Sequence, residues 1–315
     1  MKDLNIVFMG TPDFAVTILD ALVKHNYNIV GVITAPDKPA GRGRKLNQSA
    51  VKKYALEHNL NILQPTNLKS DVFLDELKAL KANLQIIVAF RMLPKVVWQM
   101  PELGTFNLHA SLLPQYRGAA PINWAIINGE TQTGVSTFFI DEKIDTGEMI
   151  FQETIDIESD ENAGSLHDKL MHTGSDLVIK TVKAIEAGEV TTIPQQDFEG
   201  IKTAYKLNRD NCKIDFTKDI DTIYNLIRGL DPYPAAYCEL VNGEDCIETK
   251  IHKTEKLIEA HDYENGQLII TKKELKAAVT GGYINILELK LSGKRKMKAV
   301  DLINGFKFEK NAKLR

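Results

Sequence analysis

The stretch FNLHASLLPQYRGAAP, residues 106–121, combines residue types that can do chemistry with a spacing that presents them together. Side chains alternate along a strand, so Phe106 and Leu108 would face one way and Asn107 and His109 the other. An asparagine amide can donate a hydrogen bond to a developing oxyanion, and a histidine can move a proton near neutral pH. A lone histidine is more often structural, but a polar pair followed directly by a turn favours an active site.

A carboxylate that orients and charges the histidine would complete this constellation. The best candidate is Asp145 in DEKIDTGEM, just past the apolar run VSTFFI and beside Gly147. Asp141 and Glu142 lie in the same loop, and spacing alone does not choose among the three. The chain has no G-x-S-x-G nucleophile, and Ser111 lacks an elbow of that type. Attack by an external nucleophile therefore fits better than a covalent intermediate.

The elements that must position these residues follow an α/β pattern. Apolar runs such as LNIVFMG, YNIVGVIT and LQIIVAF are divided by amphipathic stretches, the first of which puts Phe14, Ile18 and Leu22 on one helical face. Unbroken apolar strands between helices predict a doubly wound, Rossmann-like, mostly parallel sheet covered on both faces. Ligands bind such sheets at the carboxyl ends of their strands, where FNLHA would end. The dinucleotide fingerprint G-x-G-x-x-G is absent from FMGTPDF, which argues against a nicotinamide cofactor.

The pattern changes after Gly188. The next residues have no sustained period, and short strand-like segments then alternate with the turn signals NGED, ENG and TGG, as in a small β-barrel. We therefore predict a catalytic domain over residues 1–189, a linker over 190–206 and an OB-like barrel domain over 207–315.

Basic residues gather in two segments. DKPAGRGRKLNQSAVKK carries six positive charges and no acidic residue after its first position, and KLSGKRKMK adds another group late in the chain. A charge run is usually a solvated surface, but two such segments on two domains favour a nucleic acid that contacts both. The charge balance agrees, because residues 206–315 carry 20 Lys and Arg against 17 Asp and Glu, while the rest of the chain is net acidic.

Length and composition set broad limits. The chain has 315 residues and a net charge of −3, which suits two globular domains and argues against an obligate nucleic-acid binder. The three cysteines are scattered without metal-ligand spacing, and no apolar stretch approaches a signal peptide or a membrane span. We expect a cytoplasmic monomer without a metal.

The run NLHASLLPQYRGAAP with the later DTGEM resembles the signature of the folate-dependent formyltransferases. FMGTPDFA, PDKPAGRGRKL and DPYPAA resemble the members of that family that formylate methionyl initiator tRNA. The resemblance extends from the first strand to KRKM and implies transfer of the formyl group of 10-formyltetrahydrofolate to the α-amino group of methionine on that tRNA, for translation initiation. One segment departs from the family pattern, because Phe90, Arg91 and Met92 stand where a longer segment with a tyrosine–glycine pair is usual.

The resemblance also implies roles for individual residues. Asn107, His109 and Asp145 match the catalytic triad of the family. The turn that binds tetrahydrofolate is matched by Ser111, Leu112, Leu113 and Pro114, and the loop around Arg42 matches the insertion that engages the tRNA acceptor end. Together the resemblance and the two basic segments predict tRNA contacts at Lys38, Arg42, Arg44, Lys45, Lys294, Arg295 and Lys296.

Two other functions stay open on the sequence alone. A formyltransferase acting on a small amine, such as glycinamide ribonucleotide or an amino sugar, would use the same core but would leave the basic insertion and the barrel without a purpose. A non-catalytic nucleic-acid-binding protein would explain the basic segments but not Asn107, His109 and Asp145.

Overall fold

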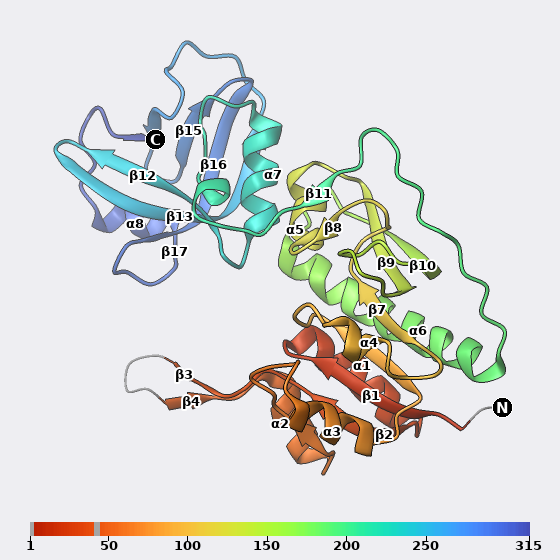
Figure 1. Ribbon diagram of the computed structural model, residues 1–315. Coiled ribbons are helices and arrows are strands. Elements are labelled where there is room, and N and C mark those ends of the chain that lie inside the picture. Colours follow the sequence, from red (N-terminus) through yellow and green to blue (C-terminus); the bar gives the residue numbers. More distant parts are fainter. Residues whose placement is uncertain (1–2, 41–44) are drawn as a thin grey trace. The chain divides into compact units, whose positions relative to one another are not determined.

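The computed structural model describes residues 3–40 and 45–315. This part of the chain forms two compact units (Figure 1). The first comprises Met1–Gly118, Gly134–Ile155 and His167–Thr203, and the second comprises Ala119–Thr133, Asp156–Leu166 and Ala204–Arg315. The domain boundaries at residues 189 and 206 stay predictions from the sequence.

The first unit is built on a seven-stranded sheet with the strand order β10-β9-β7-β6-β1-β2-β5. The pairs β1–β2, β1–β6, β2–β5 and β6–β7 are parallel, and β9 runs antiparallel to β7. The expected mostly parallel, doubly wound sheet is therefore confirmed. Its strands are β1 (Asn5–Gly10), β2 (Asn28–Ile33), β5 (Ile62–Leu63), β6 (Leu84–Val88), β7 (Thr105–His109), β9 (Gln132–Phe139) and β10 (Met149–Asp156).

Helices cover both faces of this sheet. On one face Val7, Met9 and Ile87 pack in a core with residues of α3 and α4. On the other face Gly174 of α6 lies so close to Leu108 that an added Cβ would come within 2.8 Å of it. The helices of the first part of the chain are α1 (Asp13–Lys24), α2 (Ala50–Glu57), α3 (Asp71–Ala79), α4 (Lys95–Trp98), α5 (Pro121–Ile127) and α6 (Ala163–Ala187).

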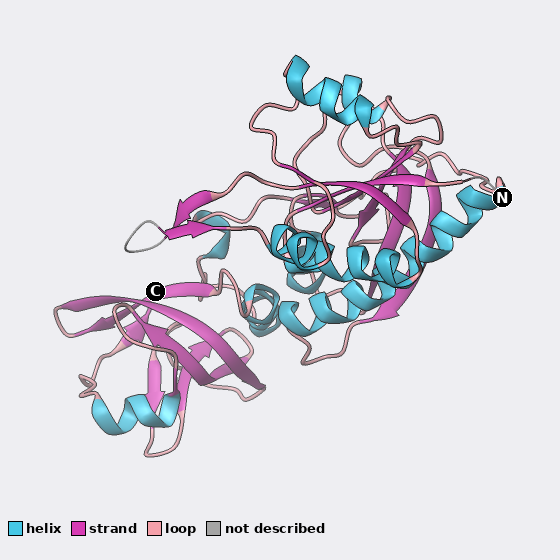
Figure 2. Cartoon of the chain, turned by 90° about the horizontal axis from the view of Figure 1, so that it is seen from below, coloured by secondary structure: helices cyan, strands magenta, loops and turns pink. Residues whose placement is uncertain are grey.

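The second unit is the expected barrel-like domain. Its antiparallel sheet runs in the order β14-β15-β16-β13-β12-β18, with β17 paired to β16. A bridge between Gln267 and Lys313 returns β18 towards β14 and nearly closes the sheet on itself. The strands are β12 (Ala236–Asn242), β13 (Asp245–Leu257), β14 (Leu268–Ile270), β15 (Leu275–Val279), β16 (Gly282–Leu291), β17 (Met297–Lys298) and β18 (Lys313–Leu314). The unit is rich in strands (Figure 2) and also contains the helices α5, α7 (Ile220–Leu230) and α8 (Ala299–Gly305).

Two short strand pairings in the described residues lie outside these two sheets. The first basic segment contains an antiparallel pair of three-residue strands, β3 (Lys38–Ala40) and β4 (Lys45–Asn47). β8 (Arg117–Gly118) pairs with β11 (Thr203–Ala204), which lies in the segment predicted to be a linker. Among the described residues, no helix has the length and apolar character that a membrane crossing would require.

Candidate active site

Asn107 and His109 lie at the carboxyl end of β7, a central strand between β6 and β9. Strand alternation holds, because the side chains of Phe106 and Leu108 are buried and Leu108 faces α6. Asn107 is half-buried, and its Oδ1 is a buried acceptor without a hydrogen-bond partner among the described residues. Such orphaned polar atoms are rare in folded proteins and point to a site where a ligand completes the hydrogen bonds.

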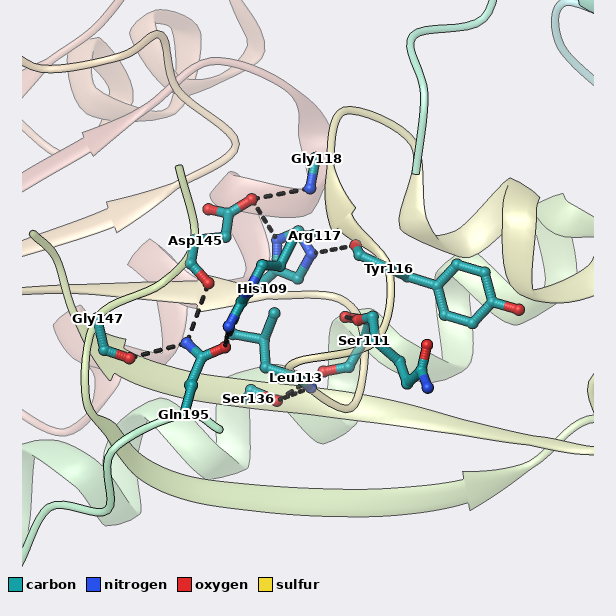
Figure 3. Close-up of polar contacts among 11 residues, drawn as sticks. His109, Ser111, Leu113, Tyr116, Arg117, Gly118, Ser136, Asp145, Gly147 and Gln195 are labelled. Carbon is teal, nitrogen blue, oxygen red and sulfur yellow. Dashed lines mark hydrogen bonds and ion pairs between the residues drawn. The ribbon is translucent and has the colours of Figure 1, made fainter. Parts of the chain in front are cut away.

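Each ring nitrogen of His109 faces a protein group. Its Nε2 lies 2.8 Å from the carbonyl oxygen of Tyr116. A carbonyl only accepts, so Nε2 carries a proton in this contact. Its Nδ1 lies 3.8 Å from Oδ2 of Asp145, an ion-pair distance longer than a hydrogen bond (Figure 3). The second ring nitrogen therefore faces the carboxylate of Asp145.

Asp145 takes its place because the loop that carries it adopts an unusual backbone. Its φ is +55°, the left-handed region that aspartate tolerates better than most residues. Gly147 follows where the loop passes Phe139 so closely that an added Cβ would lie 1.7 Å from the carbonyl oxygen of Phe139. Oδ2 of Asp145 also accepts a hydrogen bond from the backbone N–H of Gly118 at 2.9 Å. The carboxylate is therefore held beside His109 by the strand β8 as well as by its own loop.

The structure separates Asp145 from the two other carboxylates of its loop. Asp141 accepts hydrogen bonds from the Thr146 hydroxyl and the Lys143 N–H, so it stabilises the turn of the loop itself. Glu142 is exposed and pairs with Lys95. Of the three candidates, Asp145 is the one that lies beside His109.

The predicted folate turn, residues 111–114, is held by β9 and β10, the last two strands at one side of the sheet. Ser136 of β9 donates to the Ser111 carbonyl at 2.6 Å and accepts from the Leu113 N–H at 3.1 Å. Gln152 of β10 donates to the Leu113 carbonyl at 2.9 Å. The side chains of Ser111 and Leu113 are buried, so those of Leu112 and Pro114, which are partly exposed, are the ones open to a ligand.

The segment that departs from the family pattern also has a defined structure. Ala89, directly after β6, has a φ of +47°, and Arg91 follows with its guanidinium near the Phe90 ring. Arg91 donates to the backbone carbonyls of Pro65 and Thr66. The shorter segment is thus tied to the loop after β5.

The first basic segment is less uniformly charged than its composition suggests. Lys52 pairs with Asp37 at 2.6 Å, so the expectation of six uncompensated charges was wrong for this residue. Hydrogen bonds from Gln64 and Lys52 hold the pKa of Asp37 below its usual value. Of the predicted tRNA contacts, Lys38 is exposed in β3. Arg42 and Arg44 lie outside the described residues, as does the side chain of Lys45.

The second basic segment lies in the turn between β16 and β17. Lys294, Arg295 and Lys296 are all exposed there. Lys296 pairs with Glu288 at 2.7 Å, and that hydrogen bond raises the pKa of the lysine. Arg295 and Lys296 line a pocket whose other walls are Glu288, Met297, Lys298 and Asp301. The pocket therefore mixes both signs of charge.

Sequence reasoning missed two residues that belong to this site. Arg117 lies within the stretch 106–121 and Gln195 lies in a segment without periodicity, and nothing in the sequence singles out either side chain. The side chains of Arg117 and Gln195 are hydrogen-bonded to each other, and Gln195 is also bonded to the backbone of Asp145 (Figure 3). Groups of His, Cys, Asp or Glu able to hold a metal ion do not occur in the part of the chain that the structure describes.

The chain combines a mostly parallel α/β sheet, with a polar Asn–His pair at the end of a central strand, and a barrel-like antiparallel sheet. The chain belongs to the formyltransferase family. The family model described as formyl transferase matches residues 4–182, and the model described as formyl transferase, C-terminal domain, matches residues 206–307.

Curated relatives match over the full length. The methionyl-tRNA formyltransferase of Flavobacterium johnsoniae is 64% identical over 314 residues, which cover 100% of both chains. The methionyl-tRNA formyltransferase of Bacteroides fragilis is 54% identical over 310 residues, with 97% of this chain and 96% of the relative covered.

Solved structures share the fold at much lower identity. WlaRD, a sugar 3N-formyl transferase, gives a TM-score of 0.66 at 22% identity, with 94% of this chain and 100% of that chain covered. HypX from Aquifex aeolicus, solved with tetrahydrofolic acid, gives 0.67 at 16% identity and covers 98% of this chain and 49% of that chain. At these identities the likeness establishes the fold alone.

Proposed function

We propose that this chain transfers the formyl group of 10-formyltetrahydrofolate to the α-amino group of methionyl initiator tRNA, giving N-formylmethionyl-tRNA for translation initiation. The observation that carries the proposal is the Asn107–His109–Asp145 cluster at the carboxyl end of β7. The fit to a formyl donor rests on the side-chain amide of Asn107 beside a histidine that faces a carboxylate. The Oδ1 of this amide has no protein partner and can accept from the attacking amine, while the amide nitrogen donates to the formyl oxygen. Sequence identity of 62–64% to methionyl-tRNA formyltransferases, over nearly the full length of the chain, supports the choice of acceptor.

The donor supplies a formyl carbon that an unprotonated amine can attack, so no covalent intermediate with the protein is needed. Asn107 donates through its side-chain amide to the formyl oxygen as negative charge develops there. His109 contributes positive charge to the same oxygen and passes a proton towards the departing nitrogen. For that transfer its Nε2 exchanges the Tyr116 carbonyl for the substrate. Asp145 stabilises the protonated ring across the 3.8 Å contact.

The donor is held by the turn at residues 111–114, where the side chains of Leu112 and Pro114 are partly exposed. The tRNA is engaged by the two basic segments, with Lys38, Arg42, Arg44 and Lys45 on the first. The second contributes Lys294, Arg295 and Lys296 from the turn between β16 and β17. Exposed lysines and arginines suit the sequence-independent attraction of a phosphate backbone. We further propose that the protein acts as a monomer in the cytoplasm, which sedimentation of the purified chain and fractionation of cells would check.

The direct test offers labelled 10-formyltetrahydrofolate with three acceptors in parallel: methionyl initiator tRNA, free methionine and a small amine such as glycinamide ribonucleotide. We expect label on the methionyl-tRNA alone. If only the small amine became labelled, methionyl-tRNA would not be the acceptor and the proposal would be wrong. Binding of tRNA without any transfer would favour a non-catalytic binder.

A further inference from the structure

Gln195 uses every hydrogen-bonding position of its side-chain amide at the candidate active site. Its Nε2 donates to the carbonyl of Asp145 at 3.0 Å and to the carbonyl of Gly147 at 2.8 Å. Its Oε1 accepts from Nε of Arg117 at 3.1 Å and from Nη2 of the same guanidinium at 2.9 Å. Two donors and two acceptor lone pairs are all that a glutamine amide has. Figure 3 shows the amide between the loop and the arginine.

The two carbonyls belong to the part of the loop whose backbone is most constrained. Asp145 has a φ of +55°, and Gly147 passes within contact distance of the Phe139 backbone. A non-glycine residue stays in the left-handed region only where its surroundings determine that conformation. Gln195 binds the carbonyl of that very residue, so it supports the conformation that turns the Asp145 carboxylate towards His109.

Arg117 and its neighbour Gly118 link Gln195 to the carboxylate of Asp145. Its side chain binds Gln195, while the next residue, Gly118, donates from its backbone to Oδ2 of Asp145 at 2.9 Å. Asp145 is therefore held at its carbonyl through Gln195 and at its carboxylate through the backbone after Arg117. The guanidinium also pairs with the exposed Asp197 at 2.7 Å.

The segment that carries Gln195 is itself anchored to the sheet. Two residues before it, Ile193 forms an antiparallel bridge with Met149 at the start of β10, with both hydrogen bonds at 2.9 Å. This short pairing sets the position of the chain so that Gln195 reaches the loop. Gln196, its neighbour, is exposed to solvent.

We propose that Gln195 is a positioning residue for formyl transfer, which acts through Asp145 to keep the carboxylate beside His109. The proposal rests on the proposed function of the site and extends it to the segment between α6 and β11. Because Gln195 binds the protein backbone and Arg117, its loss changes the placement of Asp145 and leaves substrate contacts intact.

The test compares Gln195→Ala with Gln196→Ala, a matched change at the next position, in formyl transfer to methionyl-tRNA. We expect kcat of Gln195→Ala to fall about 10- to 100-fold, since misplacement of a reacting group by about 1 Å can cost 100-fold. The KM for either substrate should stay within about twofold, and Gln196→Ala should behave as wild type. Gln195→Met keeps the length of the side chain but cannot make its hydrogen bonds. It should show the same fall in kcat, which would exclude the cavity left by alanine as the cause.

A double-mutant cycle separates positioning from general damage to the fold. In an Asp145→Asn background, adding Gln195→Ala should change kcat by less than about twofold, because residues that act as one unit are not additive. Full multiplication of the two effects would overturn the proposal, and so would wild-type kcat in folded Gln195→Ala and Gln195→Met.

A readout without turnover keeps this proposal distinct from the proposed function. The ring nitrogen resonances of His109, identified from their loss in His109→Asn, should shift alike in Gln195→Ala and Asp145→Asn and stay unchanged in Gln196→Ala. Absence of formyl transfer by the wild-type chain would refute the proposed function, while this spectrum would still decide the role of Gln195. An unshifted His109 signal in Gln195→Ala would contradict it.

Discussion

At the scale of single residues, Asn107 is the proposed oxyanion donor of the candidate active site. Its Oδ1 is buried without a partner, and its strand neighbours Phe106 and Leu108 anchor the backbone in the core. We predict that Asn107→Ala lowers kcat about 100- to 1,000-fold through loss of an oxyanion donor. The exposed Asn311 provides the matched control, and Asn311→Ala should keep wild-type rates. Unchanged formyl transfer by a folded Asn107→Ala enzyme would remove this residue from the mechanism.

The same residues show how far a sequence alone leads to the site. Asn107 and His109 could be predicted because alternation along a strand is a local rule. The choice of Asp145 over Asp141 and Glu142 depended on the backbone conformation of the loop and on the Gly118 N–H, which arises from another segment. Gln195 could not be predicted, because its role comes from a backbone pairing 40 residues or more away in the chain and from no pattern near it.

At the scale of elements, the turn before Pro114 depends on a buried hydroxyl in β9. Ser136 accepts from the Leu113 N–H and donates to the Ser111 carbonyl. Ser136→Ala would leave both groups without this partner, and we predict a loss of about 1–3 kcal/mol in the free energy of unfolding. The KM for the formyl donor should rise as the turn loosens. Urea titration should find no comparable loss in Ser292→Ala, a change at an exposed turn, and equal stability of the two variants would contradict the argument.

Helix α7 contains a buried arginine whose role is also structural. Arg228 donates to the Glu161 carbonyl and to Asn225, both at 2.8 Å, and burial lowers its pKa. We predict that Arg228→Met destabilises the protein by about 1–3 kcal/mol, because the buried carbonyl loses its donor. Arg209→Met is the control, since Arg209 is exposed and a solvent-exposed ion pair such as its pair with Glu248 contributes little to stability. Equal melting temperatures for the two variants would count against this role.

The elements that the sequence predicted are those with strong periodicity. The unbroken apolar runs became the parallel strands, and NGED, ENG and TGG divided the barrel strands as expected. Strand β10 was missed because most of its residues after Ile150 are exposed, so the apolar alternation that marks a half-buried strand is absent. The three-residue strands β3 and β4 are too short to carry any period.

At the scale of the whole molecule, the charge distribution makes a prediction about the substrate. Residues 206–315 are net positive although the chain as a whole carries −3, and exposed basic side chains occur at Lys38 and in the turn before β17. If these charges meet tRNA phosphates, raising the salt concentration from about 50 to 200 mM should lower kcat/KM for methionyl-tRNA about tenfold or more. The rate at saturating tRNA should change little, because salt acts on association. A kcat/KM independent of salt would contradict phosphate contacts.

Arg42 tests the same idea at one position of the first basic segment. We predict that Arg42→Ala raises the KM for methionyl-tRNA and flattens the dependence of log kcat/KM on log salt by about one unit or less, the amount that one phosphate contact contributes. The KM for the formyl donor should not change, because that substrate binds at the turn before Pro114. Arg315→Ala is the control, since its guanidinium is already paired with Glu239 at 3.0 Å. If Arg42→Ala altered the KM for the donor and left that for tRNA unchanged, the basic segment would belong to the donor site, and the recognition of tRNA would have to come from the second unit.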